Sequence, residues 1–563
     1  MKLEAQVELV SPKFQKRSAL KFAGRTILCA KHIRISHMRS YVGLYCKSNN
    51  PAQRRVMRLK LQKLSEWKFV SRIIPHKQVL NTSQRALEIN SQSLFWGFIP
   101  VILILFFLSG CLRPPDTIKD VRDLSQDHTA YLTETAKEKY ILASEDQVKV
   151  NEDYDKIYFS VWHNLQPVHS SSEKVSLIFK KFALSLGYGE NKKKHSASWL
   201  KKLQQNASLD DYPNTLKPAI TTRNTNLRML PTQGPHFYSS DGDISGWPFD
   251  NLQISSVTAN TPLIICHLSA DKSWALVETS FAFGWMPVED YALVDENFIK
   301  TWESGRYAVI TKDKAVIFDT DGRFNLRTSI GQIFPLVREM PEKLEILTAA
   351  ADENKNAIIK HGVVSPKVIA LKPLPFTYSN AVKIANELID EPYGWGGLYG
   401  NRDCSAMTRD FFAPFGIWLP RHSEDQVKKA GTLIDLQNLE PQQKEKIVLE
   451  KGIPYLSLLW RKGHVMLYIG EQNGRALIFH NAWGLKTIDF SGKEGRKIIG
   501  KAVITTLYPG AELYCLDPGG LLLKNISAMT ILGPIKQNQQ PQQNVIPATE
   551  NINGVMPAKA GIQ

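Results

Sequence analysis

The sequence predicts an α+β chain of several domains, and three patterns along its 563 residues carry this prediction. Between residues 129 and 210, apolar side chains recur at spacings of three and four, which is typical of amphipathic helices. From residue 246 the pattern changes to short apolar runs bounded by turn residues, which indicates strands. Further on, between residues 377 and 508, two helical segments precede a predicted β-hairpin. A chain of this length can hold roughly three or four domains.

The positive charge of the chain is concentrated in residues 1–90. The net charge of the whole chain is +16, and residues 1–90 contain 19 Lys and Arg but only four Glu. The rest of the chain is therefore almost neutral, which argues against a long basic face for nucleic acid. A nucleic-acid-binding role would depend on this leader alone. It shows no sustained periodicity, so no fold is predicted for it. We interpret this basic leader as upstream sequence that is translated together with the protein and is not native to it.

Residues 91–111 have the pattern of a bacterial lipoprotein signal peptide. The run from Leu94 to Gly110 is apolar, carries no charge and ends at Cys111. It is shorter than the roughly 20 residues of a membrane-spanning helix, so a cleaved signal is favoured over an uncleaved anchor. The segment Leu-Ser-Gly-Cys111 resembles a lipobox, and Leu112 after it favours sorting to the outer membrane by the same resemblance. We therefore expect a periplasm-facing lipoprotein whose membrane anchor is a lipid on Cys111.

Residues 112–245 are predicted to form a tether and a helical N-terminal domain. The amphipathic pattern is clearest where five apolar residues share one helical face: Val175, Ile178, Phe179, Phe182 and Ala183. Residues 211–245 are rich in Pro, Asn, Thr, Asp and Gly, so we expect a long loop that ends this domain.

Two small β-barrels are predicted next, over residues 246–300 and 301–360. In the first, three strand-like runs are separated by turn residues, and the sequence Gly-Trp-Met-Pro-Val from residue 284 resembles a bacterial SH3-like domain. A second strand-rich block follows it. Trp274 and Trp285 are expected in the barrel core more than in a ligand cleft, because Trp is generally well buried.

Residues 365–515 have the element order of a further α+β domain, and residues 516–563 are predicted to be a disordered tail. Residues 377–390 show a helical pattern, and a Gly- and Trp-rich turn separates them from a second helix that begins at Cys404. Two apolar runs then flank Asn-Gly at residue 473, which is a hairpin signal. The end of the chain is rich in Gln, Asn and Pro, a composition typical of disorder.

Cys404 is the candidate nucleophile of this domain. It follows Asp403 at the expected start of a helix, where N–H groups and the positive end of the helix dipole favour a thiolate. A thiol nucleophile also needs a base and a group that orients the base. His464 opens the first hairpin strand and His480 lies in the second, so both side chains can share one face at about 5 Å. The predicted catalytic set is Cys404, His464 and His480.

Residues 377–508 resemble the NlpC/p60 family of papain-like cysteine peptidases. The resemblance rests on Tyr393-Gly-Trp-Gly-Gly, Asp403-Cys-Ser, Ile417-Trp-Leu-Pro-Arg-His-Ser-Glu-Asp-Gln and Gly463-His-Val-Met-Leu-Tyr-Ile-Gly. It implies a papain-like α+β domain in which Cys404 is the nucleophile, His464 the general base and His480 the orienting group. The layout of residues 130–510 is similar to family lipoproteins with a helical N-terminal region and two SH3-like domains.

The resemblance also implies a substrate, the γ-D-glutamyl–diamino acid bond of peptidoglycan stem peptides. In members with SH3-like domains, the residues matching Tyr393, Asp403 and Ser405 line the pocket, where the carboxylate pairs with the free amine of an N-terminal L-Ala. The chain departs from the common pattern at Ala406 and His422, and at residues 454–460 a Gly-Asp pair is missing. The last departure affects the expected strand register near His464. An acidic contact from the first SH3-like domain is left unassigned.

Three alternatives remain open at this point. The chain could be a non-catalytic wall-binding lipoprotein, an amidase or acyltransferase on the same fold, or a cytoplasmic nucleic-acid binder if residues 1–90 are native. The intact set of Cys404, His464 and His480 favours an enzyme over the first of these. The six cysteines show no metal-ligand spacing, so no metal or other cofactor is expected.

Overall fold

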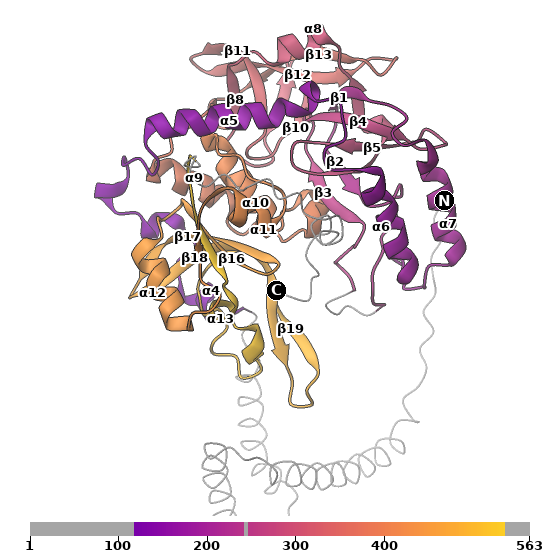
Figure 1. Ribbon diagram of the computed structural model, residues 1–563. Coiled ribbons are helices and arrows are strands. Elements are labelled where there is room, and N and C mark those ends of the chain that lie inside the picture. The colour runs from indigo at the N-terminus through magenta and orange to yellow at the C-terminus, as the bar shows by residue number, and fades with distance from the viewer. Residues whose placement is uncertain (1–116, 241–245, 535–563) are drawn as a thin grey trace, which may run out of the picture. The chain divides into compact units, whose positions relative to one another are not determined.

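The computed structural model describes residues 117–240 and 246–534 (Figure 1). The predicted leader, the signal segment with Cys111 and the end of the predicted tail lie outside these residues. Within them, the elements follow the expected order of helices, two β-sheets and a mixed α+β domain. No helix in the described ranges combines the length and the apolar character that a membrane crossing requires.

The N-terminal region is helical, as predicted. Its α-helices are α4 (Lys119–Asp123), α5 (Ser144–His163), α6 (Ser172–Leu184) and α7 (Ala197–Ala207). The amphipathic face of α6 buries Val175, Ile178, Phe179 and Phe182, whereas Ala183 is exposed. Ser171 caps α6, and its side chain accepts a hydrogen bond from the N–H of Lys174.

The first sheet has seven antiparallel strands in the order β3-β2-β6-β5-β4-β1-β7. They are β1 (Lys217–Thr221), β2 (Thr225–Arg228), β3 (Gln253–Val257), β4 (Pro262–Leu268), β5 (Trp274–Glu278), β6 (Phe283–Pro287) and β7 (Tyr291–Leu293). The predicted boundary at residue 246 is therefore wrong, because β1 and β2 lie inside the expected loop. Both strands are four or five residues long and contain polar residues, so composition hid them. Trp285 is fully buried in the core of this sheet.

The second sheet also has seven strands, in the order β10-β9-β13-β12-β11-β8-β14. They are β8 (Tyr307–Ile310), β9 (Val316–Asp319), β10 (Phe324–Arg327), β11 (Ile333–Met340), β12 (Lys343–Ala351), β13 (Ala357–Val364) and β14 (Ile369–Leu371). Helix α8 (Glu296–Trp302) connects the two sheets. The domain runs to residue 371, beyond the predicted end at 360, because β14 pairs with β8 at its far edge.

The last domain combines helices with a six-stranded sheet in the order β15-β20-β16-β17-β18-β19. Its strands are β15 (Gly431–Asp435), β16 (Ser457–Arg461), β17 (His464–Gln472), β18 (Arg475–Ile488), β19 (Glu494–Thr506) and β20 (Ala528–Leu532). Its helices are α9 (Tyr378–Leu388), α10 (Cys404–Phe412), α11 (Ser423–Lys429), α12 (Pro441–Lys451) and α13 (Leu522–Asn525). The predicted tail from residue 516 is wrong over this part, because β20 pairs between β15 and β16 in the sheet.

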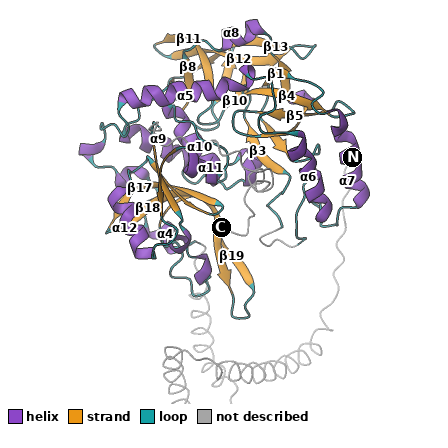
Figure 2. Ribbon diagram, in the orientation of Figure 1, coloured by secondary structure: helices purple, strands orange, loops and turns teal. Residues whose placement is uncertain are grey.

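Helix α5 ties the three parts together (Figure 2). The side-chain amide of Gln147 donates to the carbonyls of Leu374 and Phe415 in the last domain. Near the other end of the helix, the indole N–H of Trp162 donates to the carbonyl of Ala219 in β1. Aromatic residues of α5 also share one apolar core with strands of both seven-stranded sheets. The domains of the two seven-stranded sheets, which correspond to the two predicted barrels, are therefore packed against the α+β domain. They can contribute residues to its site.

Candidate active site

Cys404 is the first residue of α10, as predicted. The side chain of Asp403, the N-cap, accepts a hydrogen bond from the N–H of Ala406 at 2.9 Å. Cys404 is buried, with only 5% of its surface exposed. The apolar face of α10 buries Phe411 and Phe412 against the sheet, which fixes the direction in which the helix start points.

The glycine-rich turn before Cys404 is shaped by the first barrel. Gly396 and Gly397 have φ values of +58° and +84°, a region that side chains rarely adopt. A Cβ on Gly397 would clash with Oγ of Ser256 in β3. The amide of Gln253, also in β3, donates to the carbonyl of Gly396 at 3.0 Å. The turn needs glycine because the backbone of another domain lies directly against it.

Asp403 forms a buried ion pair with Arg421. The guanidinium reaches both carboxylate oxygens, with Nη2 2.6 Å from Oδ2 and Nη1 3.1 Å from Oδ1. The N–H of Gly396 donates to the same carboxylate, and Nε of Arg421 donates to Ser255 in β3. Burial raises the pKa of Asp403, but the Arg421 charge and the hydrogen bonds from Arg421, the Ala406 N–H and the Ser405 hydroxyl hold it below its ordinary value. An ammonium group of a ligand has to compete with Arg421 for this carboxylate.

The Cys404 thiol is neutral in the free protein. Burial raises its pKa to about 12, and the charge of Asp403 adds to the effect. The backbone N–H groups of Val465 and Ser405 and the charge of Arg421 act in the opposite direction and are outweighed. The expected help from the helix N-terminus is present, but it is smaller than the cost of burial. Ionisation of Cys404 therefore needs a base that takes the proton.

His464 and His480 form a buried chain with a third residue, Thr505. Nε2 of His464 lies 2.8 Å from Nδ1 of His480, and Nε2 of His480 lies 3.1 Å from Oγ1 of Thr505. The Thr505 hydroxyl donates to the carbonyl of Thr506 at 2.9 Å, so it accepts from His480. His480 then carries its proton on Nε2 and accepts on Nδ1 from His464. This assignment leaves Nδ1 of His464 as the unprotonated, basic nitrogen.

Both imidazoles are neutral at physiological pH. Burial lowers the pKa of His480 to about 3. It also lowers the pKa of His464 well below its ordinary value, and electrostatic interactions with His480 and Arg461 add to this effect. The N–H of Val465, the residue after His464, acts on the Cys404 thiol, so the thiol lies against the first residues of β17. The site therefore holds a neutral thiol at the start of the strand that carries a neutral base.

The second barrel contacts the residue on the other side of Asp403. Arg402 is buried, and its guanidinium forms two hydrogen bonds to Asp313 at 2.7 and 2.9 Å. Its Nε donates to Asp410 of α10 at 2.8 Å, and Nη1 lies 3.5 Å from the carboxylate of Glu391. The carbonyl of Arg402 accepts from Asn481 of β18. Both barrels thus hold the loop that presents Cys404.

Aromatic side chains form a wall beside the glycine-rich turn. Phe249, Tyr393 and Trp395 are buried together, and Trp483 of β18 packs against Phe249 at 5.6 Å and Tyr393 at 5.9 Å between ring centroids. The indole N–H of Trp395 donates to the carbonyl of Asp250. Tyr393 therefore lies where the first barrel meets the α+β domain, next to the strand that carries His480.

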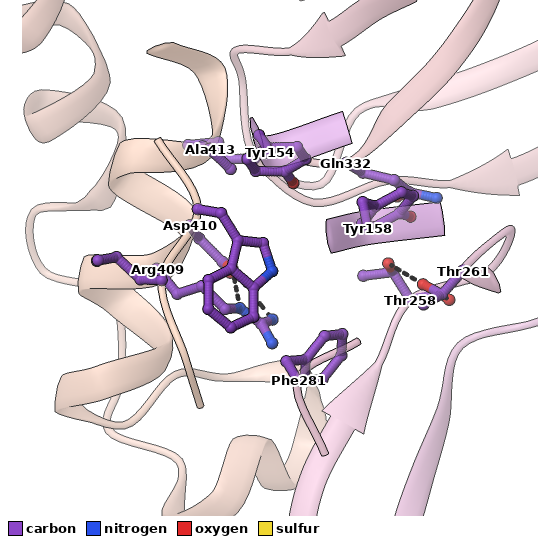
Figure 3. A pocket seen from close by; sticks show the side chains of 13 residues that line it. Tyr154, Tyr158, Thr258, Thr261, Phe281, Gln332, Arg409, Asp410 and Ala413 are labelled. Atoms are coloured by element: carbon purple, nitrogen blue, oxygen red, sulfur yellow. Dashed lines mark hydrogen bonds and ion pairs between the residues drawn. The ribbon is translucent and has the colours of Figure 1, made fainter. Parts of the chain in front are cut away.

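A small cavity lies where α5, both barrels and the far half of α10 meet (Figure 3). Its volume is about 50 Å³, enough for a few water molecules and too small for a peptide. The Arg409 guanidinium lies 4.1 Å from the centre of the Phe281 ring, and its Nη1 is buried without a hydrogen-bond partner. Arg409 is in the second half of α10, away from Cys404, so this cavity is separate from the candidate active site.

The structure brings together most of the residues that the sequence singled out. Asp403, Cys404 and Ser405 share the start of α10, His464 and His480 are in direct contact, and Tyr393 lies beside the turn. Sequence reasoning missed Arg421, Thr505 and Arg402. Only Arg421 had a local signal, since it stands in the quoted Leu-Pro-Arg-His segment. The strand register near His464 is regular, because Arg461 pairs with His464 across a two-residue turn.

Comparisons with known proteins agree with this architecture. Family models match residues 98–212 (NLPC_P60 stabilising domain, N term), 235–287 (SH3 domain, SH3b1 type), 295–341 (SH3 domain of SH3b2 type) and 390–491 (NlpC/P60 family). Among solved structures, an NlpC/P60 endopeptidase from Photobacterium damselae subsp. piscicida is similar at 26% identity and a TM-score of 0.65. The match covers 72% of this chain and 97% of that chain.

A second similar structure is an NlpC/P60 family protein from Bacillus cereus ATCC 10987. It is 17% identical with a TM-score of 0.35, and the match covers 50% of this chain and 83% of that chain. The peptidoglycan hydrolase RipB from Mycobacterium tuberculosis matches at 22% identity and a TM-score of 0.13, over 22% of this chain and 61% of that chain. Among curated proteins, none matches this chain.

The fold and the site define a peptidase-like α+β domain that follows a helical stabilising region and two SH3b domains. The chain belongs to the NlpC/P60 family. Its fold is similar to that of an NlpC/P60 endopeptidase.

Proposed function

We propose that this protein is a peptidoglycan endopeptidase that cleaves the γ-D-glutamyl–diamino acid bond of stem peptides through Cys404, His464 and His480. The observation that carries the proposal is the His464–His480–Thr505 chain, which leaves a basic nitrogen on the strand beside the thiol. This chain fixes which nitrogen of His464 carries the proton. A base that accepts a proton from a neutral thiol needs such a fixed tautomer.

In the proposed reaction, Sγ of Cys404 attacks the γ-carbonyl carbon while its proton passes to Nδ1 of His464. The oxyanion is stabilised by backbone N–H groups at the start of α10, with the N–H of Cys404 the first candidate. His464 then gives the proton to the leaving amine, which departs and leaves a thioester on Cys404. Water, deprotonated by His464, hydrolyses the thioester and releases the γ-glutamyl product.

The proposed substrate has a free N-terminal L-Ala, with Tyr393, Asp403 and Ser405 lining the site for it. Support comes from β3 of the first SH3b domain, which lies against the turn beside these residues. The Arg421–Asp403 ion pair means that a substrate ammonium approaches a carboxylate that is already shared. Tyr393 and the Ser405 hydroxyl are therefore as important as Asp403 in this proposal.

The test is a product analysis by mass spectrometry. Purified protein is incubated with L-Ala-γ-D-Glu-diamino acid peptides, and release of L-Ala-D-Glu is expected. Cys404→Ala is the blank and should release none. An amidase would release other fragments and an acyltransferase would give products of higher mass. If the protein is folded and the substrate is not cleaved, the non-catalytic wall-binding role is favoured.

The proposal extends to the membrane anchor at Cys111, which is part of residues that the structure does not describe. The apolar run before Cys111 and its lipobox-like end support lipid attachment and outer-membrane localisation. Metabolic labelling with a fatty-acid probe, compared between the wild type and Cys111→Ser, tests this point. The mass of the labelled protein then tests whether residues 1–90 remain on the mature protein.

Replacing Thr505 by Val should lower kcat more than KM. The change removes the acceptor for Nε2 of His480, so His480 can move its proton to Nδ1 and His464 then loses its basic Nδ1. We expect kcat for the dipeptide release to fall roughly 10- to 100-fold. Thr505→Ser should keep most of the activity.

The matched control is Thr530→Val. Thr530 is also a fully buried threonine of this sheet, and its hydroxyl donates to the carbonyl of Thr432. If both Val variants changed kcat equally, the effect would come from the sheet and not from the tautomer of His480.

A further inference from the structure

Arg461 lies directly beside the proposed catalytic base. It is the last residue of β16, and it pairs with His464 across the turn formed by Lys462 and Gly463. Side chains directly opposite each other in an antiparallel pair point to the same face, about 5 Å apart at Cβ. The charge of Arg461 also acts on His464. The Arg461 guanidinium therefore stands on the side of the sheet that His464 faces.

This guanidinium is buried without a carboxylate partner. Arg461 is 8% exposed, and its Nε has no hydrogen-bond partner. No Asp or Glu among residues 117–240 and 246–534 is within ion-pair distance of Arg461. Burial lowers its pKa to about 10, and the nearby charge of Arg496 adds to this effect. The positive charges of Arg461 and Arg496 therefore lie close to each other where solvent access is limited.

Glu494 and Asp517, the acidic residues near Arg496, both form ion pairs with Lys486. Glu494 and Asp517 act on Arg496, but Nζ of Lys486 holds them at 2.5 and 3.1 Å. They do not act on Arg461. A buried charge without a counter-ion is costly, and this cost is recovered when an anion binds. The arrangement is that of a preformed anion site whose anion arrives with a ligand.

We propose that Arg461, supported by Arg496, binds the free α-carboxylate of the leaving diamino acid. The inference rests on the proposed function, because His464 must reach the leaving nitrogen to protonate it. The α-carboxyl carbon is two bonds from that nitrogen, so it lies next to the residue opposite His464. A guanidinium matches a carboxylate in charge and shape. The preferred substrate is then a stem peptide that ends at the diamino acid, and not one extended by D-Ala.

The experiment compares two tripeptides, L-Ala-γ-D-Glu-meso-diaminopimelate with a free α-carboxylate and the same peptide with an α-carboxamide. The wild type should cleave the acid with a kcat/KM roughly 10- to 100-fold higher. Arg461→Gln should bring this ratio close to one by reducing cleavage of the acid. Arg461→Lys should keep part of the preference. The ratio does not depend on how much of a variant is folded.

Two controls make the outcome specific. Arg475→Gln removes a half-exposed arginine of β18 that pairs with Glu445, and the acid-to-amide ratio should not change. A second pair of peptides carries L-lysine in place of diaminopimelate, and the preference for the acid should persist. If Arg461→Gln instead removed a preference for the diaminopimelate peptides over the lysine peptides and left the acid-to-amide ratio unchanged, Arg461 would be assigned to the side-chain carboxylate and the proposal would be overturned.

Two further results would also overturn it. One is equal cleavage of acid and amide by the wild type. The other is a loss in Arg461→Gln that is restored by amidation of the D-glutamyl carboxylate, which would place Arg461 on the other side of the scissile bond. In all these cases dipeptide release continues. Failure of the proposed function is different, because then neither the acid nor the amide is cleaved.

Discussion

Replacing Arg402 by Met should destabilise the protein by about 3–5 kcal/mol. Arg402 is buried among three carboxylates, those of Asp313, Asp410 and Glu391. Without the guanidinium these carboxylates lose their shared counter-ion in a place that water reaches poorly. Burial raises the pKa of Glu391 and the Arg402 charge lowers it, so removal of Arg402 leaves only the half-exposed Lys314 to offset the cost of burial. The free energy of unfolding in urea measures the effect.

Arg306→Met is the matched control for this substitution. Arg306 pairs with Glu339 at 3.0 Å in the second SH3b domain, but the two side chains are 68% and 47% exposed. An exposed pair contributes at most about 1 kcal/mol. The double variant Arg402→Met, Asp313→Asn should recover part of the loss, because it removes one of the stranded charges. Equal losses in Arg402→Met and Arg306→Met would contradict the account of a buried network.

The Arg402 network also explains why SH3b domains precede a peptidase-like domain in this chain. Arg402 directly precedes Asp403 and Cys404, and its anchor Asp313 comes from the second SH3b domain. On the other side of the loop, Gln253 and Ser255 of the first SH3b domain hold Gly396 and Arg421. The loop that presents the thiol is thus fixed from two domains, and the Arg402 variant should lose activity together with stability.

The sequence predicted those site residues whose position depends on neighbouring residues in the chain. Cys404 was recognisable because a cap, a glycine-rich turn and a helix pattern lie next to it in the chain. His464 and His480 were recognisable because a hairpin turn sets which residues of two strands face each other. Thr505 had no such signal, since it is brought to His480 from a strand that pairs at a distance of 25 residues. Asp313 is 89 residues from Arg402 and meets it only through domain packing.

The domain boundaries failed for a related reason. β1 and β2 are short and polar in part, and their pairing with β4, β6 and β3 is what makes them strands. β20 has a run of apolar residues, Ala-Met-Thr-Ile-Leu, that local composition could have revealed. It was hidden by the polar low-complexity sequence that follows it. The sequence predicted that the helix N-terminus would favour a thiolate, but burial raises the pKa of Cys404 by more than the helix lowers it. This burial depends on the packing of α10, which the sequence does not reveal.

Acidification from pH 6.5 to 5 should destabilise the protein steeply. Six histidines have pKa values below their ordinary value of 6.5, and four of them have the largest shifts: His128 and His480 at about 3, His422 at about 4, and His464 well below. The pKa values of His169 and His236 are lowered as well. Burial is the largest cause in each case. The unfolded chain therefore takes up protons near pH 6.5 that the folded protein does not accept. Stability is fully present above pH 6.5 and is lost as the pH falls towards these lower values.

The size of the effect follows from the number of groups. Each histidine contributes about 1.4 kcal/mol per pH unit once the unfolded chain is protonated, so four give a slope of up to about 5 kcal/mol per pH unit. Buried carboxyls with raised pKa values, such as Asp155 and Asp290, oppose this trend at lower pH, so pH 7.5 to 5 is the informative window. Urea midpoints measured across it should fall continuously below pH 6.5.

His128→Gln separates the structural histidines from the proposed catalytic pair. His128 lies on the N-terminal region, where Nδ1 is 3.0 Å from the Tyr455 hydroxyl, and it has no part in the proposed reaction. Its replacement should reduce the slope by one proton, about 1.4 kcal/mol per pH unit, and leave the acid limb of kcat/KM unchanged. That limb reports the protonation of His464 and should lie below pH 6.5, because the pKa of His464 is lowered. Urea midpoints that stayed constant down to pH 5 would show that these histidines are not buried as neutral groups.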